Sequence, residues 1–163
     1  MRKISTVFIA IAWMAGSSLF ASTKGGFTGK WVLDKNGASG DDAPQDLVEN
    51  IRQKGADVSI DSQFAEPSNG MVPLLYLGVM TNKLMLSADG TERQNQIGPF
   101  QMGAKTTMDG NSMKTEWTAM VEGKQVNGNW VRTLSGDGKR MTMEIHETTE
   151  GQDRQATLQF RRK

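Results

Sequence analysis

Phe27-Thr28-Gly29-Lys30-Trp31 begins the first predicted β-strand, which continues through Val32 and Leu33. Side chains alternate between the two faces of a strand. An indole beside a residue without a side chain predicts a ring that packs against a nearby backbone or a neighbouring strand. We therefore expect one face of this strand to be buried, and its members are Phe27, Gly29, Trp31 and Leu33.

Residues 1–22 have the features of an export signal. Arg2 and Lys3 precede a short apolar stretch at 7–15, and small residues follow it. The apolar stretch is short for a membrane span, although a retained anchor is the alternative. We expect cleavage near Ala21 or Ser22, which leaves 23–163 as one exported domain, periplasmic or secreted.

Composition argues against several classes of partner. Arg2 and Lys3 account for two of the 19 basic side chains, so 17 remain against 18 acidic ones. A nearly neutral domain is a poor nucleic-acid binder, because that binding depends on neutralising phosphates. The chain has no cysteine, which excludes disulfides and thiolate metal sites. We expect no nucleic-acid partner, no stable membrane insertion and no cofactor.

Short alternating segments separated by turn dipeptides such as Asp89-Gly90 and Asp109-Gly110 predict an all-β chain of about ten antiparallel strands. A long meander has exposed edges unless it closes, so we expect a β-barrel. The expected strands are 27–33, 58–64, 74–80, 83–86, 91–97, 100–108, 112–121, 125–134, 140–147 and 155–162.

One helix is predicted, at 42–54. Asp42 is a suitable N-cap, Gly55 stands where a glycine ends a helix, and a narrow apolar stripe lies between them. The stripe consists of Leu47, Val48 and Ile51. We expect this helix to form a lid over the barrel mouth, with docking of a protein partner or a membrane surface as the alternatives.

The order of these elements resembles the calycin superfamily, and the fatty-acid-binding proteins more than the lipocalins. The opening Phe27 to Trp31 is similar to the F-x-G-x-W start of that family, and a helical segment follows the first strand. Residues 105–145 resemble the later hairpins of the family, through the Thr107 to Gly110 turn and the Trp130 to Leu134 strand. The resemblance implies a barrel that binds a hydrophobic ligand in its interior, with Gly29 and Trp31 at its closed end.

Strand alternation places Arg132 on an inward face between Trp130 and Leu134. A buried arginine needs a partner, and a ligand carboxylate would bind it through two hydrogen bonds. The resemblance implies the same role for Arg132. The alternatives are an internal glutamate, or a one-residue shift of register that exposes the side chain.

The last strand lacks the R-x-Y pair of that family, and Arg162 is expected either to approach the ligand or to pack over Trp31. The methionines either fill the core or form a deformable lining for several ligands. The predicted ligand-binding residues are Arg132, Trp130, Trp117, Met113, Met141, Met143 and Arg162.

Catalysis and metal binding are weaker hypotheses. His146 is the single histidine, and alternation places it on the outer face of its strand. Haem or metal ligation by His146 and Cu(I) binding by Met141 and Met143 are the alternatives to a solvated surface. We predict a non-enzymatic protein that binds a hydrophobic or amphipathic small molecule, which could carry a carboxylate. A closed-core barrel with a structural or protein-interaction role is the second hypothesis.

Overall fold

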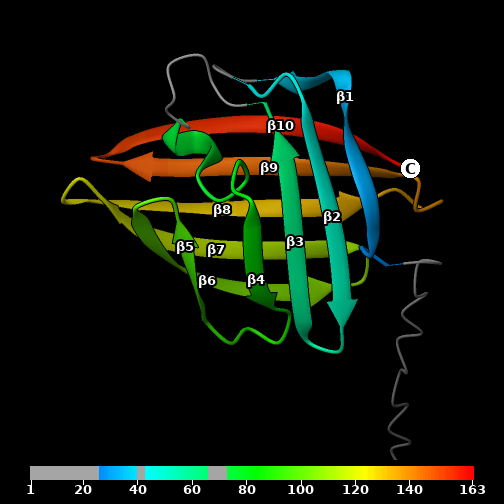
Figure 1. Ribbon diagram of the computed structural model, residues 1–163, viewed down its shortest axis with the longest axis horizontal. Coiled ribbons are helices and arrows are strands. Elements are labelled where there is room, and N and C mark those ends of the chain that lie inside the picture. Colours follow the sequence, from blue (N-terminus) through cyan, green and yellow to red (C-terminus); the bar gives the residue numbers. More distant parts are fainter. Residues whose placement is uncertain (1–25, 40–42, 66–72) are drawn as a thin grey trace, which may run out of the picture.

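A computed structural model describes residues 26–39, 43–65 and 73–163, and in these ranges the chain forms one ten-stranded antiparallel sheet (Figure 1). The predicted signal peptide, 1–22, lies outside the described residues. The strands are β1 (Gly29–Ser39), β2 (Leu47–Lys54), β3 (Asp57–Phe64), β4 (Lys83–Ser87), β5 (Arg93–Ile97), β6 (Phe100–Asp109), β7 (Ser112–Val121), β8 (Lys124–Leu134), β9 (Arg140–Thr149) and β10 (Gln152–Arg162).

The sheet curls into two layers that face each other. Its order is β4-β3-β2-β1-β10-β9-β8-β7-β6-β5, and Figure 1 shows β1–β4 crossing in front of β6–β10. Inward residues alternate with exposed ones along β7, β8 and β9, as expected for strands with one buried face. The core therefore fills the space between the layers, as the sequence predicted for a barrel.

The two edge strands, β4 and β5, are joined by a side chain instead of a backbone ladder. Asn95 Oδ1 accepts a hydrogen bond from Met85 N at 2.7 Å, and Asn95 Nδ2 donates to Met85 O at 3.1 Å. An ion pair between Arg93 and Asp57, at 2.8 Å, also connects β5 to β3. The barrel is thus nearly closed, with one weak seam.

The predicted helix at 42–54 is wrong. Residue 42 lies outside the described residues, and Leu47–Lys54 forms strand β2, paired with β1 and β3. The inward positions are Leu47, Glu49 and Ile51, which follow the period of a strand. A buried glutamate in the middle of this series hid the alternation, so the apolar residues that remained resembled a helical stripe.

The predicted strand at 74–80 is also wrong. Leu74–Tyr76 forms a single 3₁₀ turn, η1, and residues 75–81 are all buried. This turn lies beside β9 and β10 at one end of the barrel (Figure 1). Leu75, Leu77, Val79 and Met80 are buried there, which explains why the segment is apolar without the alternation of a strand. We call residues 73–81 the plug. Within the described ranges, no helix is long and apolar enough to cross a membrane.

Trp31 lies where β1 pairs with β10, directly opposite Arg162 in the ladder. Its Nε1 donates to Phe27 O at 2.8 Å, and the Arg162 guanidinium carbon lies 4.5 Å from the centre of the ring. The Arg162 side chain fills the space beside Gly29, where its Nε lies 3.6 Å from the position that a Cβ would take. Of the two positions that the sequence allowed for Arg162, the structure has the one over Trp31.

Candidate ligand-binding site in the barrel interior

Arg132 lies inside the barrel and is fully buried. It belongs to the inward series of β8, and its ladder neighbours are Met113 on β7 and Met143 on β9, both buried as well. A guanidinium in such a place must be neutralised, because moving an unpaired charge out of water costs more free energy than the net stability of a typical domain.

Glu49 neutralises it from the opposite layer of the barrel. Arg132 Nη2 donates to Glu49 Oε1 at 2.8 Å, and Nε donates to Oε2 at 3.3 Å. Neither side chain is exposed to solvent. This is the two-pronged geometry that a guanidinium forms with a carboxylate. The protein's own Glu49 therefore occupies the nitrogens that a ligand carboxylate would be expected to use.

One guanidinium nitrogen remains available. Nη1 of Arg132 is buried and has no hydrogen-bond partner among residues 26–39, 43–65 and 73–163. The guanidinium carbon lies 5.8 Å from the centre of the Trp130 ring, within the range of a cation–π contact. Arg132 thus presents one free NH2 group, with two N–H donors, beside an aromatic surface.

Trp130 and Trp117 form an aromatic wall next to Arg132. Their ring centroids are 5.7 Å apart, and the planes are inclined by 30°. Gly128 makes room for this arrangement, because a Cβ there would lie 2.4 Å from Cζ2 of Trp117. Both indole N–H groups are buried and find no acceptor in the described part of the chain. The wall therefore offers two donors as well as two ring faces.

Glu147 is a second buried carboxylate, which was not predicted although it continues the inward alternation of Met141, Met143 and Ile145 along β9. It faces inward on β9, directly opposite Gly128 in the β8 ladder and Arg154 in the β10 ladder. The Thr149 hydroxyl donates to Oε1. The other oxygen, Oε2, has no hydrogen bond to any described residue, and Arg154 Nε is 3.7 Å away.

The predicted methionines lie in the same interior. Met113, Met141 and Met143 are buried, and Met102 contacts the plug near Gly78. Their flexible thioethers line the barrel around the buried charges. A Cβ on Gly78 would lie 2.6 Å from Trp130 Cη2, so the plug is in direct contact with the aromatic wall.

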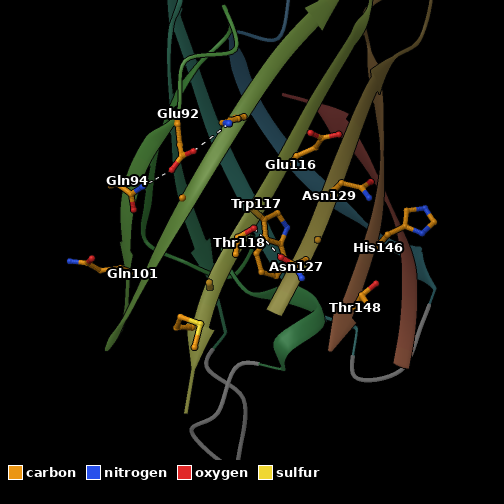
Figure 2. Close-up of a pocket in the computed structure, with 15 residues that line it drawn as sticks. Glu92, Gln94, Gln101, Glu116, Trp117, Thr118, Asn127, Asn129, His146 and Thr148 are labelled. Carbon is orange, nitrogen blue, oxygen red and sulfur yellow. Dashed lines mark hydrogen bonds and ion pairs between the residues drawn. The ribbon is translucent and has the colours of Figure 1, made fainter. Parts of the chain in front are cut away.

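The outer face of the sheet carries different chemistry. A shallow hollow of about 800 Å³ lies across β5–β9, and Figure 2 shows His146, Asn129 and Thr148 at one side of it. His146 is exposed, as alternation predicted. Several polar groups there bond to each other, for example Thr118 Oγ1 to Asn127 Oδ1 at 3.0 Å (Figure 2).

This outer hollow is a poor anchor for a ligand, because its polar groups are open to water and partly satisfy one another. The ranges that the structure describes also contain no group of three or more His, Cys, Asp or Glu side chains that could hold a metal ion. The interior, with its buried and unpaired polar atoms, is the better candidate site.

The sequence matches no protein-family model and no curated protein. Solved structures do resemble it. A secretory abundant heat soluble protein from Ramazzottius varieornatus shares 15% identity over 84% of this chain and 95% of its own, with a TM-score of 0.55. The zebrafish ileal bile acid-binding protein, solved with cholic acid, shares 16% identity over 84% of this chain and 98% of its own, with a TM-score of 0.52.

The fatty-acid-binding protein 1 of Echinococcus granulosus shares 11% identity over 83% of this chain and 96% of its own, with a TM-score of 0.51. At such identities the likeness shows the fold alone. The fold is calycin-like, as the sequence predicted.

Proposed function

We propose that this chain is an exported protein that binds a hydrophobic or amphipathic small molecule inside the barrel. The observation that carries the proposal is a set of four buried interior atoms without hydrogen-bond partners among the described residues. They are Arg132 Nη1, Trp117 Nε1, Trp130 Nε1 and Glu147 Oε2. Each unpaired group costs about 1–3 kcal/mol, so a purely structural core would not be expected to keep four of them. A bound molecule with polar groups would satisfy them.

The plug supports the proposal because it is not held by any strand ladder. Residues 73–81 contribute a single 3₁₀ turn to the barrel end, and Gly78 lies against Trp130. Withdrawal of this segment would uncover the aromatic wall without breaking the sheet. We expect a ligand to take the space that the plug now fills beside Trp130.

In this proposal the apolar part of the ligand contacts Trp117, Trp130, Met113, Met141 and Met143. A ligand carboxylate would have to displace Glu49 from Arg132 or use Nη1 alone. Arg162 would support the closed end through Trp31 and leave ligand contact to the other residues.

A closed-core barrel is the second candidate function, and one observation favours it. The plug already fills the barrel end, and Glu49 already neutralises Arg132. In that case the barrel would act as a structural or protein-interaction module with no small-molecule ligand.

Native mass spectrometry of the purified mature protein separates the two functions. We expect additional mass that organic solvent removes, and we expect a hydrophobic probe to quench the fluorescence of Trp117 and Trp130. If no bound species were found and no probe changed the fluorescence, the closed-core function would replace the proposed one.

Export is tested by the mass of the mature chain. Residues 1–22 have the composition of a signal peptide, so the protein recovered outside the cytoplasm should begin after Ala21 or Ser22. Intact-mass measurement of the protein from cell fractions provides the check. A chain that keeps Arg2 and Lys3 and remains in the cytoplasm would contradict the proposal.

A further inference from the structure

The buried charges of the barrel interior are not equally satisfied. Arg132, the cation expected to bind a ligand, is held by Glu49 through two hydrogen bonds. Glu147, a carboxylate, keeps one oxygen without any hydrogen bond to the described residues. Of the four unsatisfied interior atoms named above, Glu147 Oε2 is the acceptor that a positive group would bind, and the other three are donors.

The surroundings of Glu147 fit a cation. Glu147 stands opposite Gly128 in the ladder, and the Trp117 ring lies directly over Gly128. The carboxylate and the indole thus border the same part of the interior, with Trp130 next to them at 5.7 Å between ring centroids. A carboxylate beside aromatic faces is the general chemistry by which proteins bind ammonium groups.

Arg154 is a weak competitor for this position. Its Nε lies 3.7 Å from Glu147 Oε2, beyond hydrogen-bond distance, and 47% of its side chain is exposed to solvent. Water solvates the half-exposed guanidinium, so at this distance Arg154 compensates only part of the charge of the fully buried Glu147. An ammonium group placed inside the barrel would approach Oε2 more closely.

We infer that the ligand carries an ammonium head group, which binds Glu147 Oε2 beside Trp117 and Trp130 while its apolar tail occupies the methionine-lined interior. The inference rests on the proposed function, since it identifies the head group of the ligand in the same interior. It assigns a role to Glu147 and leaves Arg132 and Glu49 as a closed pair.

The test compares three amphiphiles that share a tail: dodecylammonium, dodecanol and dodecanoate. Binding to the mature protein is measured below their aggregation limits, by calorimetry and by tryptophan fluorescence. We expect dodecylammonium to bind at least about tenfold more tightly than the other two. If none of the three binds, the proposed function itself fails. If dodecanol or dodecanoate binds as tightly as the amine, only the head-group assignment fails.

Variants locate the effect. Glu147→Gln keeps the size of the side chain and should abolish the preference for the amine, with dodecanol affinity unchanged. Glu144→Gln is the matched control, because Glu144 lies on the same strand but is exposed, and it should retain the preference. A Glu147→Gln protein that folds and still prefers the amine would overturn the inference.

Arg154→Gln should change amine affinity in the direction opposite to Glu147→Gln. Removing the cation that lies near Glu147 should raise dodecylammonium affinity severalfold, an effect that destabilisation does not mimic. Unchanged or weaker amine binding in this variant would count against the assignment.

Discussion

The pair of Arg132 and Glu49 joins the two layers of the barrel at the level of single residues. The two side chains lie 83 positions apart in the sequence, and neither is exposed. Removing one partner of a buried ion pair leaves the other charge without compensation, whereas removing both restores an apolar interior. The pair therefore fixes how β2 faces β8, even where its net contribution to stability is small.

A double-mutant cycle tests this role. Arg132→Met and Glu49→Leu should each lower the free energy of unfolding by about 3–5 kcal/mol. The double variant should lose much less than the sum of the two. Urea denaturation measures all three variants, and additive losses would show that the two charges do not depend on each other.

An exposed ion pair in the same part of the sheet supplies the control. Arg52 and Asp61 lie 3.2 Å apart on β2 and β3, with 74% and 35% of their side chains exposed. Arg52→Ala should cost no more than about 1 kcal/mol, because water screens such pairs.

Glu49 also explains why β2 was predicted as a helix. Without Glu49, the inward series of β2 would show Leu47 and Ile51 at the spacing of one helical turn, and the outward Val48 completes an apparent stripe. The partner that makes burial of Glu49 possible lies on β8. A local pattern carries no information about so distant a partner, so the strand could not be identified from its own residues.

At the scale of elements, the plug and its glycine provide a sharp test. Gly78 has a φ of +79°, and an added Cβ would lie 2.6 Å from the Trp130 ring. Gly78→Ala should push the plug away from the wall. We expect greater quenching of Trp130 by acrylamide and stronger binding of the probe anilinonaphthalene sulfonate than in the parent protein.

Gly123 is a matched control for this prediction. It has the same φ of +79°, and nothing lies within 4 Å of an added Cβ. Gly123→Ala should cost about 1–2 kcal/mol of backbone strain and leave probe binding unchanged. Equal probe binding by the two variants would mean that the plug does not guard the interior.

The turn between β8 and β9 makes stability depend on pH. The Ser135 hydroxyl donates to Asp137 Oδ1 at 2.7 Å, and the Lys139 backbone N–H donates to the same oxygen at 3.0 Å. These bonds, led by that of Ser135, lower the pKa of Asp137 in the folded state below its ordinary 3.8. The contribution of ionised Asp137 to the free energy of unfolding is present above pH 3.8 and is lost as the pH falls through the lowered pKa.

Asp137→Asn tests this turn. The parent should be more stable than the variant near neutral pH, and the difference should shrink as the pH falls below 3.8. Urea titrations at a series of pH values measure it. A difference that grows in acid would contradict the assignment.

For the molecule as a whole, the sequence predicted the architecture better than the individual elements. The strand total agrees with the structure because two errors cancel: β2 was taken as a helix, and the plug was taken as a strand. Hairpins with clear turn dipeptides, from β6 to β10, were confirmed, since their pairing is local. Glu49 and the plug depend on contacts across the barrel, which a strand pattern does not contain.

The seam between β4 and β5 should be the first part of the barrel to open. Each strand has five residues, and the Asn95 side chain replaces the ladder between them. Local opening has a low free energy where few buried contacts and backbone bonds must break. Hydrogen exchange followed by mass spectrometry should therefore show fast exchange at 83–87 and 93–97, and the slowest exchange in β7, β8 and β9.

Asn95→Ala should accelerate exchange at this seam and leave β8 protected. It removes two hydrogen bonds that together contribute about 1–3 kcal/mol to closing the seam. Asn127→Ala is the control, since Asn127 is exposed and accepts bonds only from the side chains of Thr118 and Gln125 among the described residues. Faster exchange throughout the barrel after Asn95→Ala would mean that the seam opens only with the whole molecule. Faster exchange confined to the seam would mark it as the flexible side of the barrel.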